Sequence, residues 1–480
     1  MKIFLVIPPW NVPIMAQKKP SIFRNLSIYK GLPTHGCYNH IGFLYIASYL
    51  DRDGHKIKYI DGLIEGEKGI YDSIKKEKPD LVGFTVVTSL WDKVKELSEN
   101  IKRINPSCKI VVGGIHATLK YKECLEECRY IDYVVIGEGE LASKAIANAI
   151  QQNASIENIK GIAYKDGDEI RINLPGEIIQ NLDELPFPDR DLVPMKKYIS
   201  HLALFKNRHA AHVFTSRSCP YECSFCNMGS LLNKLRVRSP ENILEEIKLI
   251  FSKYPYIKDV SFMDEFNIFS VKHDDGRRLA EMFMKQLPRF HWSLIHPNFS
   301  WDIELMKLYR KAGLWRIYLP IDSGVQRVRD YTHTPPKSVD EIREFTHRLH
   351  EAGIESAARF TFGHPVESEE DIEATIEFAK QCRIKYVNFL PALIAPYSRH
   401  FNYLNEKRLI NEDMKTWNIY NSDYYESHPV SRKRVDFFRR KATKEYYLRL
   451  SYFKDYLCWS LKSWKNFTEP LRYIMRMIGE

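Results

Sequence analysis

The sequence has no apolar segment approaching the about 18 to 20 residues that a transmembrane helix requires, so no membrane span is predicted. The first apolar run, residues 3–7, is too short for the core of a signal peptide, and no small-residue cleavage site follows it. A cytoplasmic location is therefore expected. Cysteine is scarce, with nine in 480 residues, and three of the nine fall within residues 219–226. This distribution favours metal chemistry in a reducing compartment over a disulfide framework.

The charge balance adds few restrictions. The 71 basic and 61 acidic residues leave a net charge of +10, most of it locally balanced, so nucleic-acid binding is not predicted from charge. Hydrophobic residues make up 44% and charged residues 28%, values that are ordinary for a globular protein and not for a disordered or membrane protein. The length suggests two or three domains with large cores, which is ample for an enzyme.

Residues 1–152 alternate short β-branched runs with helical periods, a pattern typical of a parallel sheet covered by helices. We expect a doubly wound, Rossmann-type α/β domain, in which ligands bind at the carboxyl ends of the strands. The five predicted strands are Lys2–Ile7, Lys56–Ile60, Leu81–Val87, Lys109–Val112 and Tyr133–Ile136, and helices are expected at Phe43–Leu50 and Trp91–Ile104.

Residues 153–200 are predicted to connect two domains, because a small β-rich piece is followed by the Pro- and Asp-rich stretch 183–191, which cannot continue a helix. A second βα series follows in residues 201–400. Its predicted strands are Ala211–Ser216, Asp259–Met263, Arg289–Ile295, Trp315–Ile321, Ser356–Phe362 and Tyr386–Leu390. Six βα units are too few for a closed eight-stranded barrel, so an open, partial (β/α)6 barrel is expected.

Residues 401–480 are predicted to form a helical C-terminal region. Its 16 basic and 10 acidic residues carry +6 of the net charge, and aromatic residues lie between them. The simplest interpretation is that the aromatic residues are core contacts that close the open barrel, while the basic residues form a solvated face. A surface for a hydrophobic substrate or a membrane-bound lipid, with peripheral membrane contact, is the alternative.

The clearest chemical signal is the loop Ser218-Cys219-Pro220-Tyr221-Glu222-Cys223-Ser224-Phe225-Cys226, which follows a predicted strand. Three thiolates this close can bind three irons of a [4Fe–4S] cluster and leave the fourth iron without a protein ligand. S-adenosylmethionine can chelate that iron, and an electron from the cluster then releases a 5′-deoxyadenosyl radical. The alternative is a zinc site with one outside ligand, but the three-then-two spacing with an aromatic residue before the last cysteine is not typical of zinc loops.

This spacing, with Phe225, resembles the signature of the radical S-adenosylmethionine superfamily, and the resemblance covers nearly all of residues 201–400. It implies an oxygen-sensitive cluster on Cys219, Cys223 and Cys226. It also implies a set of residues that contact S-adenosylmethionine. These are Asp264 and Glu265 after the second strand, Asp322 and Ser323 in a stretch similar to Glu-Ser-Gly-x-Gln, and Arg359. Asp322 replaces the usual Glu and has a shorter reach, and residues 391–398 depart from the usual Pro-x-Pro-Gly-Thr, so the floor of the substrate cavity is expected to differ from the family pattern.

A parallel-sheet domain before a radical domain resembles the cobalamin-binding subclass of this superfamily. The similar stretches are residues 111–118, residues 135–140 and the connector 185–191. Because paired glycines let a backbone approach a bulky ligand, this resemblance predicts cobalamin contacts at Gly113, Gly114, Gly137 and Glu138. The Asp-x-His-x-x-Gly run that coordinates cobalt from below is absent. That absence implies either a lower face without a histidine ligand or a domain that has lost the cofactor.

With both cofactors, the resemblance implies methyl transfer to an unactivated carbon or to phosphorus; no catalytic side chain is predicted. Three alternatives stay open: a radical cyclase or rearrangement enzyme resembling the anaerobic magnesium-protoporphyrin monomethyl ester cyclase, a tRNA methylthiotransferase, and a non-enzymatic zinc-stabilised RNA or membrane-surface binder. The methylthiotransferase would require a β-rich tail, whereas this tail is predicted to be helical. The expected partners are a small-molecule or lipid-like substrate and an electron donor such as flavodoxin or ferredoxin, with no nucleic acid.

Overall fold

The computed structural model describes residues 1–9, 40–198, 206–207, 209–227, 234–335, 337–392, 395, 397–408, 429–452 and 454. The chain divides into two compact units, which we describe separately. Unit 1 comprises Met1–Val12 and Cys37–Tyr198, and unit 2 comprises Pro13–Gly36 and Ile199–Glu480. No helix in the described ranges combines the length and apolar character needed to cross a bilayer.

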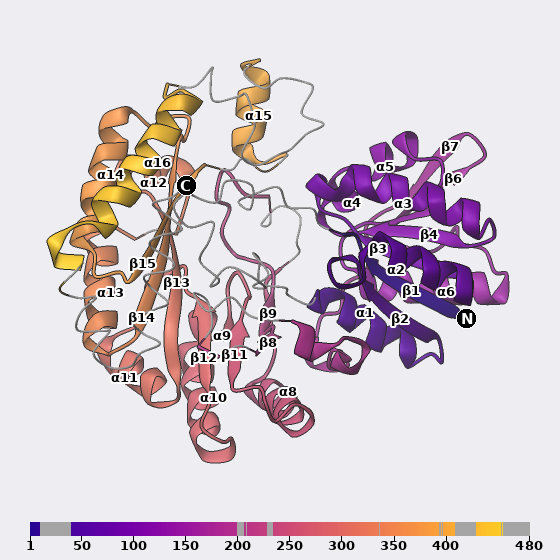
Figure 1. Ribbon diagram of the computed structural model, residues 1–480, viewed down its shortest axis with the longest axis horizontal. Helices are drawn as coiled ribbons and strands as arrows, with labels where there is room; N and C mark the ends of the chain where they lie inside the picture. Colours follow the sequence, from indigo (N-terminus) through magenta and orange to yellow (C-terminus); the bar gives the residue numbers. More distant parts are fainter. Residues whose placement is uncertain are drawn as a thin grey trace, which may run out of the picture. The chain divides into compact units, whose positions relative to one another are not determined.

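Unit 1 contains a seven-stranded sheet in the order β2-β1-β3-β4-β5-β6-β7 (Figure 1). The parallel part consists of β1 (Lys2–Ile7), β2 (Lys56–Asp61), β3 (Leu81–Thr85), β4 (Lys109–Gly113) and β5 (Tyr133–Val135). The internal strand β1 is a continuous apolar run whose residues 3–7 are all buried, as expected for a strand covered on both faces. An antiparallel hairpin of β6 (Ile162–Asp166) and β7 (Glu169–Asn173) extends the sheet beyond β5.

The helices of unit 1 lie on both faces of this sheet. They are α1 (Ile41–Asp51), α2 (Gly62–Glu77), α3 (Trp91–Ile104), α4 (Ile115–Leu119), α5 (Tyr121–Glu127) and α6 (Gly139–Gln152). In α3, Val94, Leu97 and Ile101 recur at helical spacing and are fully buried in the core. The 3₁₀ turns η3 (Thr88–Leu90), η4 (Leu182–Glu184), η5 (Arg190–Leu192) and η6 (Met195–Lys197) complete unit 1. The segment predicted as a connector thus lies within unit 1 as far as Tyr198, and its β-rich piece is part of the sheet.

Unit 2 is built on a six-stranded sheet in the order β15-β14-β13-β12-β11-β8, in which every pair is parallel. The strands are β8 (Ala210–Val213), β11 (Asp259–Phe262), β12 (His291–Ile295), β13 (Leu314–Asp322), β14 (Glu355–Phe362) and β15 (Tyr386–Pro391). Within the described residues, β8 and β15 each pair with one neighbour in this sheet, so the sheet is open there. The α/β class and the predicted partial barrel of six strands are confirmed.

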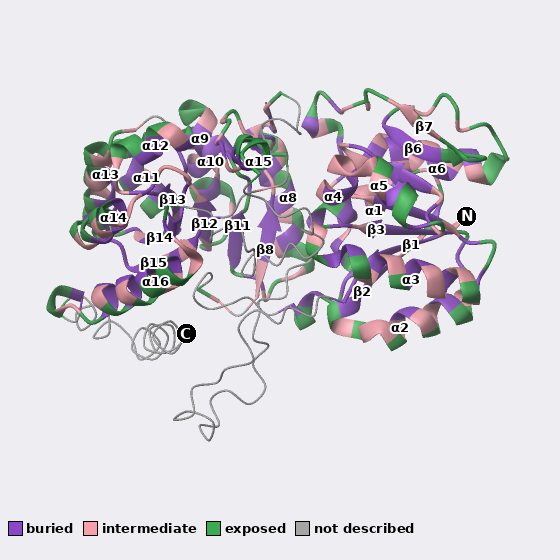
Figure 2. Cartoon of the chain, turned by 90° about the horizontal axis from the view of Figure 1, so that it is seen from above, coloured by how far each residue is buried: buried purple, intermediate pink, exposed green. Residues whose placement is uncertain are grey.

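The helices of unit 2 cover the outer face of its sheet. They are α8 (Pro240–Lys253), α9 (Ile268–Val271), α10 (His273–Gln286), α11 (Ile303–Lys311), α12 (Gln326–Thr332), α13 (Val339–Glu351) and α14 (Glu369–Gln381), and a small hairpin pairs β9 (Ser216–Arg217) with β10 (Arg236–Val237). Figure 2 shows strands that are mostly buried and helices that expose one side. Between sheet and helices, Phe262, Phe269, Phe283, Trp292 and Tyr309 form an aromatic layer with ring centroids as close as 4.7 Å.

The C-terminal region contributes α15 (Arg399–Glu406) and α16 (Arg432–Tyr447). Helix α16 covers the edge strand β15 with side-chain hydroxyls. The hydroxyl of Tyr447 accepts from Val387 N at 2.7 Å and donates to Val387 O at 2.8 Å, and Tyr446 and Tyr452 donate to the carbonyls of Ile384 and Lys385. An edge strand otherwise presents a row of unpaired backbone groups. The tyrosines therefore take the place of a seventh strand.

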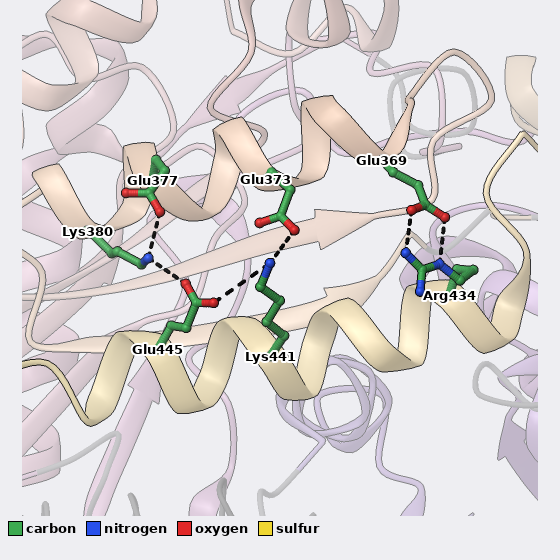
Figure 3. A network of polar contacts seen from close by, with 7 residues as sticks. All are labelled: Glu369, Glu373, Glu377, Lys380, Arg434, Lys441 and Glu445. Carbon is green, nitrogen blue, oxygen red and sulfur yellow. Dashed lines mark hydrogen bonds and ion pairs between the residues drawn. The ribbon is translucent and has the colours of Figure 1, made fainter.

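Ion pairs hold α16 in register on α14 (Figure 3). Glu369 pairs with Arg434 and Glu373 with Lys441, and Lys380 contacts Glu445 at 2.5 Å. Such partly exposed pairs contribute little free energy individually, but several along one helix pair fix its axial position. Among the described residues, the aromatic side chains of α16 are thus mostly core contacts. The remainder of the predicted tail, 409–428, 453 and 455–480 with Trp459 and Trp464, lies outside the described residues.

Candidate functional site

The cysteine loop begins directly after β9. Ser218 has a φ of 81°, a left-handed conformation that is rare for a residue other than glycine, and it is buried at 3% exposure. This conformation turns the chain out of β9 and starts the loop at Cys219. Behind the loop, Arg238 donates to the carbonyl of Phe214 at 2.7 Å and pairs with the fully buried Glu246 at 2.5 Å. The strand that leads into the loop is therefore fixed from its other side.

The three cysteines of the loop are free thiols of intermediate exposure. Burial raises the pKa of the Cys223 thiol to about 12, and the charges of Asp322, Cys226 and Cys219 contribute to this rise. Burial and the charge of Cys226 also raise the pKa of Cys219. Bound iron would stabilise the thiolate form of these cysteines against the burial that raises the pKa of Cys219 and Cys223, so the loop fits the chemistry of the predicted cluster. As the side chains stand, no three histidine, cysteine, aspartate or glutamate residues in the described ranges are grouped as a ready metal site.

The structure places Asp264 inside the protein, at 1% exposure. Its Oδ2 accepts from the backbone N–H of Thr215 at 2.8 Å and from the Thr215 hydroxyl, and the same hydroxyl accepts from Ile268 N at 2.9 Å. Burial raises the pKa of Asp264 to about 8. Asp264 thus ties the end of β11 to the chain that precedes the cysteine loop. Its neighbour Glu265 is exposed, and the charge of Glu265 contributes to the raised pKa of Cys219.

A bulge separates Pro320 and Asp322 in the pairing of β13 with β14, and Asp322 has a φ of 64°. The Asp322 carboxylate is 4% exposed and contacts Nη2 of Arg359 at 3.3 Å, and its charge helps to raise the pKa of Cys223. Phe360 contacts Phe378 of α14, so Arg359, its neighbour in the strand, projects from the opposite, inner face of the sheet. The Arg359 side chain is 44% exposed there, where it can meet an anionic ligand.

Ser323 has an internal role in the structure. It is 1% exposed, and its hydroxyl contacts Thr375 Oγ1 at 3.2 Å and accepts from Val325 N at 3.1 Å. The next residue, Gly324, leaves no room for a Cβ, which would lie 2.5 Å from Cβ of Phe378. This turn is therefore packed against α14, and it holds Asp322 in place.

In unit 1, the four predicted cobalamin contacts lie at the carboxyl ends of β4 and β5, with Gly113 the last residue of β4. Gly114 has a φ of 91°, and a Cβ there would lie 2.9 Å from Thr85 Oγ1 and 3.0 Å from Val86 N and O. The protein's own packing already requires this glycine. Gly113 leaves ordinary space for a Cβ, 3.6 Å from Val135.

Gly137 differs from Gly114. Its φ is 87°, but no atom lies within 4 Å of the position that a Cβ would take, and its N–H donates to the hydroxyl of Thr118 at 3.0 Å. Glu138, which precedes the first residue of α6, is next to it. The open backbone at the end of β5 is compatible with a bulky ligand, which fits a cobalamin-binding domain.

Two family models match the chain. The B12 binding domain matches residues 32–147, and the radical SAM superfamily matches residues 213–379. An uncharacterized methyltransferase from Pyrococcus horikoshii is 30% identical over 416 residues, which cover 85% of this chain and 84% of that protein. The chain belongs to the radical S-adenosylmethionine superfamily, in its B12-binding branch.

Other similar proteins span the same two domains. The anaerobic magnesium-protoporphyrin IX monomethyl ester cyclase of Rubrivivax gelatinosus is 27% identical over 376 residues, 76% of this chain and 66% of that protein. The solved structure of TsrM, a radical S-adenosylmethionine methyltransferase from Kitasatospora setae with cobalamin and a [4Fe–4S] cluster bound, has a TM-score of 0.67 at 18% identity and covers 85% of this chain and 78% of its own. At this identity, the structural likeness shows the fold.

These findings confirm the predicted family, enzyme class and cofactor set, which comprises a [4Fe–4S] cluster, S-adenosylmethionine and cobalamin. As a radical S-adenosylmethionine enzyme, the protein acts on a small-molecule substrate and takes an electron from a donor. The individual site residues stay predictions. The structure pairs Asp322 with Arg359, and the charges of Asp322 and Glu265 help to raise the pKa of Cys223 and of Cys219, whereas Asp264 and Ser323 bond within the protein.

Sequence reasoning did not find the residues that hold the cysteine loop from outside. His400 contacts Ser224 across 176 positions of the chain, and Thr332 and Ala395 bond to the loop backbone. None of these residues stands in a motif of its own. A long-range contact of this kind leaves no periodic or spacing signal in one sequence.

Proposed function

We propose that the protein is a cobalamin-dependent radical S-adenosylmethionine methyltransferase that methylates an unactivated carbon, or a phosphorus centre, of a small molecule. The observation that carries this proposal is the 30% identity to a methyltransferase along both domains, together with the cysteine loop at the carboxyl end of the sheet. When bound, the cluster supplies the electron that splits S-adenosylmethionine into methionine and a 5′-deoxyadenosyl radical, and cobalamin relays a methyl group.

In unit 2, Cys219, Cys223 and Cys226 would hold the cluster. Arg359 would bind the carboxylate of S-adenosylmethionine, because its guanidinium lies on the open inner face and is oriented by the nearly buried Asp322. Glu265, exposed at the end of β11, is the second polar contact that we assign to this ligand. Asp264 and Ser323 would act through the backbone they brace and not by direct contact.

In unit 1, we assign the cobalamin contacts to the exits of β4 and β5. Gly137 and Glu138 would approach the ligand, because the backbone there is open. Gly113 and Gly114 would shape the neighbouring turn, whose amide of His116 donates to Val86 O at 3.1 Å. Flavodoxin or ferredoxin is the electron donor that we expect, and a cytoplasmic location and the absence of nucleic acid stay predictions.

The test measures how much of each product is formed from S-adenosylmethionine. The chain is reconstituted anaerobically with iron, sulfide and hydroxocobalamin, and is incubated with reductant, a small-molecule cell extract and S-adenosylmethionine that carries a deuterated methyl group. Methyl transfer should give a product about three mass units heavier than its unlabelled counterpart, with about one S-adenosylhomocysteine and one 5′-deoxyadenosine formed per product. The relative from Rubrivivax gelatinosus favours cyclisation as a second candidate, which would instead give an unlabelled product and no S-adenosylhomocysteine.

A matched pair of variants tests the assigned ligand contact. Arg359→Met should weaken S-adenosylmethionine binding, measured by equilibrium dialysis of the reconstituted protein. Arg343→Met removes an exposed arginine of α13, which pairs with Asp340 at 2.6 Å, and should leave binding unchanged. Equal S-adenosylmethionine binding by both variants would show that Arg359 does not contact this ligand.

A further inference from the structure

The two residues between Cys223 and Cys226 are held by a part of the chain that follows the whole sheet. The carbonyl of Ser224 accepts from His400 N at 2.8 Å, and Ser224 Oγ forms a hydrogen bond with His400 Nε2 at 2.9 Å. Both residues are buried, at 2% and 1% exposure. His400 therefore binds Ser224 both through backbone groups and through side chains.

The next residue is held in the same way. The carbonyl of Phe225 accepts from Ala395 N at 3.0 Å, and the Phe225 ring lies 5.8 Å from the ring of His364 and 6.4 Å from that of His400. On the opposite side, Ser224 N donates to the carbonyl of Thr332, the last residue of α12, at 2.8 Å. The spacer between two cysteines is thus bonded to two separate segments, the end of α12 and the chain at Ala395 and His400.

The local structure around His400 explains why it can serve as a fixed support. It is the second residue of α15, where backbone N–H groups have no partner within the helix. Ser398 caps the neighbouring amide of Phe401 at 3.2 Å, and the amide of His400 is left to bond the cysteine loop. The His400 ring stacks on Tyr331 with centroids 5.2 Å apart and an angle of 26° between the planes, which fixes its orientation.

We propose that His400 is a positioning residue for the iron–sulfur cluster: it fixes Ser224 and Phe225, and through them the directions in which Cys223 and Cys226 project. The proposal rests on the assignment of the cluster to these cysteines. Residues that orient the ligands of a metal site typically change metal affinity by about 10- to 100-fold when they are replaced. The stretch 391–398 departs from the family pattern, and Ala395 within it and His400 just after it bond to the cysteine loop.

Four variants separate this role from a general contribution to folding. His400→Phe keeps an aromatic ring on Tyr331 but loses the side-chain bond between His400 Nε2 and Ser224 Oγ. Ser224→Ala removes the same side-chain bond from its other end. His400→Gln restores an amide near the position of Nε2. His347→Phe is the control, because His347 is exposed on α13 and its Nε2 contacts the carbonyl of Gln381, at 3.1 Å, away from the cysteine loop.

The readouts are iron per chain after identical anaerobic reconstitution, the half-life of the cluster in an iron chelator, and the electron paramagnetic resonance spectrum of the reduced cluster with and without S-adenosylmethionine. His400→Phe should shorten the half-life about tenfold and alter the spectrum. His400→Gln should recover most of the loss, and His347→Phe should match the wild type. The double variant Ser224→Ala with His400→Phe should be no worse than His400→Phe alone, because both remove one bond.

Wild-type spectra and half-lives in both His400→Phe and Ser224→Ala would overturn the proposal, as would fully additive losses in the double variant. A wild-type protein that takes up no cluster would instead refute the cysteine assignment of the proposed function, a result that the iron content alone reveals. Far-ultraviolet circular dichroism of the cluster-free proteins reports folding. If His400→Phe does not fold, the comparison of Ser224→Ala with His400→Gln decides the question on the same readouts.

Discussion

Removal of one hydroxyl group at the sheet edge should open β15 of unit 2. In Tyr447→Phe, the N–H and C=O of Val387 both lose their hydrogen-bond partner, and Tyr447 is only 1% exposed, so water has little access to replace it. An unsatisfied buried polar group costs about 1 to 3 kcal/mol, so the pair should cost about 2 to 6 kcal/mol. About 1.4 kcal/mol corresponds to a tenfold change in an equilibrium. The protection of the β15 amides against hydrogen exchange should therefore fall by roughly 30-fold or more.

Hydrogen exchange followed by mass spectrometry on peptides that cover residues 384–391 measures this effect locally, which suits a chain whose two units need not unfold together. Tyr403→Phe is the control, because Tyr403 lies on α15 with 42% exposure. Tyr452→Phe removes the bond to the carbonyl of Lys385 at 3.0 Å and should have an intermediate effect. Equal protection in Tyr447→Phe and Tyr403→Phe would refute the idea that α16 satisfies this edge.

Two further predictions concern a glycine and an acidic residue. Gly114→Ala should lower the free energy of unfolding by at least about 1 to 2 kcal/mol beyond the effect of Gly137→Ala, because an added Cβ meets Thr85 and Val86 at Gly114 but open space at Gly137. Both variants should weaken hydroxocobalamin binding in an absorbance titration, Gly137→Ala because its backbone is assigned to the ligand contact. Burial would raise the pKa of Glu355, but Arg316 and Lys385 lower it from 4.5 to about 2. Its stabilising effect is present above pH 4.5 and is lost as the pH falls toward 2, so acid unfolding followed by tryptophan fluorescence should be less steep in Glu355→Gln, and an unchanged profile would contradict the assignment.

The order of strands and helices was predictable because hydrophobic periodicity is a local signal. The predicted strand Lys2–Ile7 and helix Trp91–Ile104 match β1 and α3 residue for residue, and other ends differ by a few positions. The hairpin of β6 and β7 could be predicted as a β-rich piece. Its membership of the unit 1 sheet could not be predicted, because the pairing with β5 is a contact between distant segments. The local sequence pattern predicts whether a segment is a helix or a strand, but it does not predict which segment pairs with the edge strand of a sheet.

The candidate site divides in the same way. The spacing of the three cysteines was readable, because one loop carries all three predicted ligands. The internal roles of Asp264 and Ser323 were not, because each depends on a partner, Thr215 or Thr375, that only the fold brings near. The same holds for Gly114, whose sequence context predicts ligand approach, whereas Val86 occupies the space in the structure.

The decisive measurement is the formation of 5′-deoxyadenosine from S-adenosylmethionine by the reconstituted, reduced protein, compared with a variant in which Cys219, Cys223 and Cys226 are all replaced by alanine. We expect a brown wild-type protein that forms 5′-deoxyadenosine and methionine in equal amounts, and a colourless variant that forms neither. A wild-type protein that carries the cluster but leaves S-adenosylmethionine intact under strong reductant, or a variant that still cleaves it, would contradict the assignment of radical chemistry to this loop.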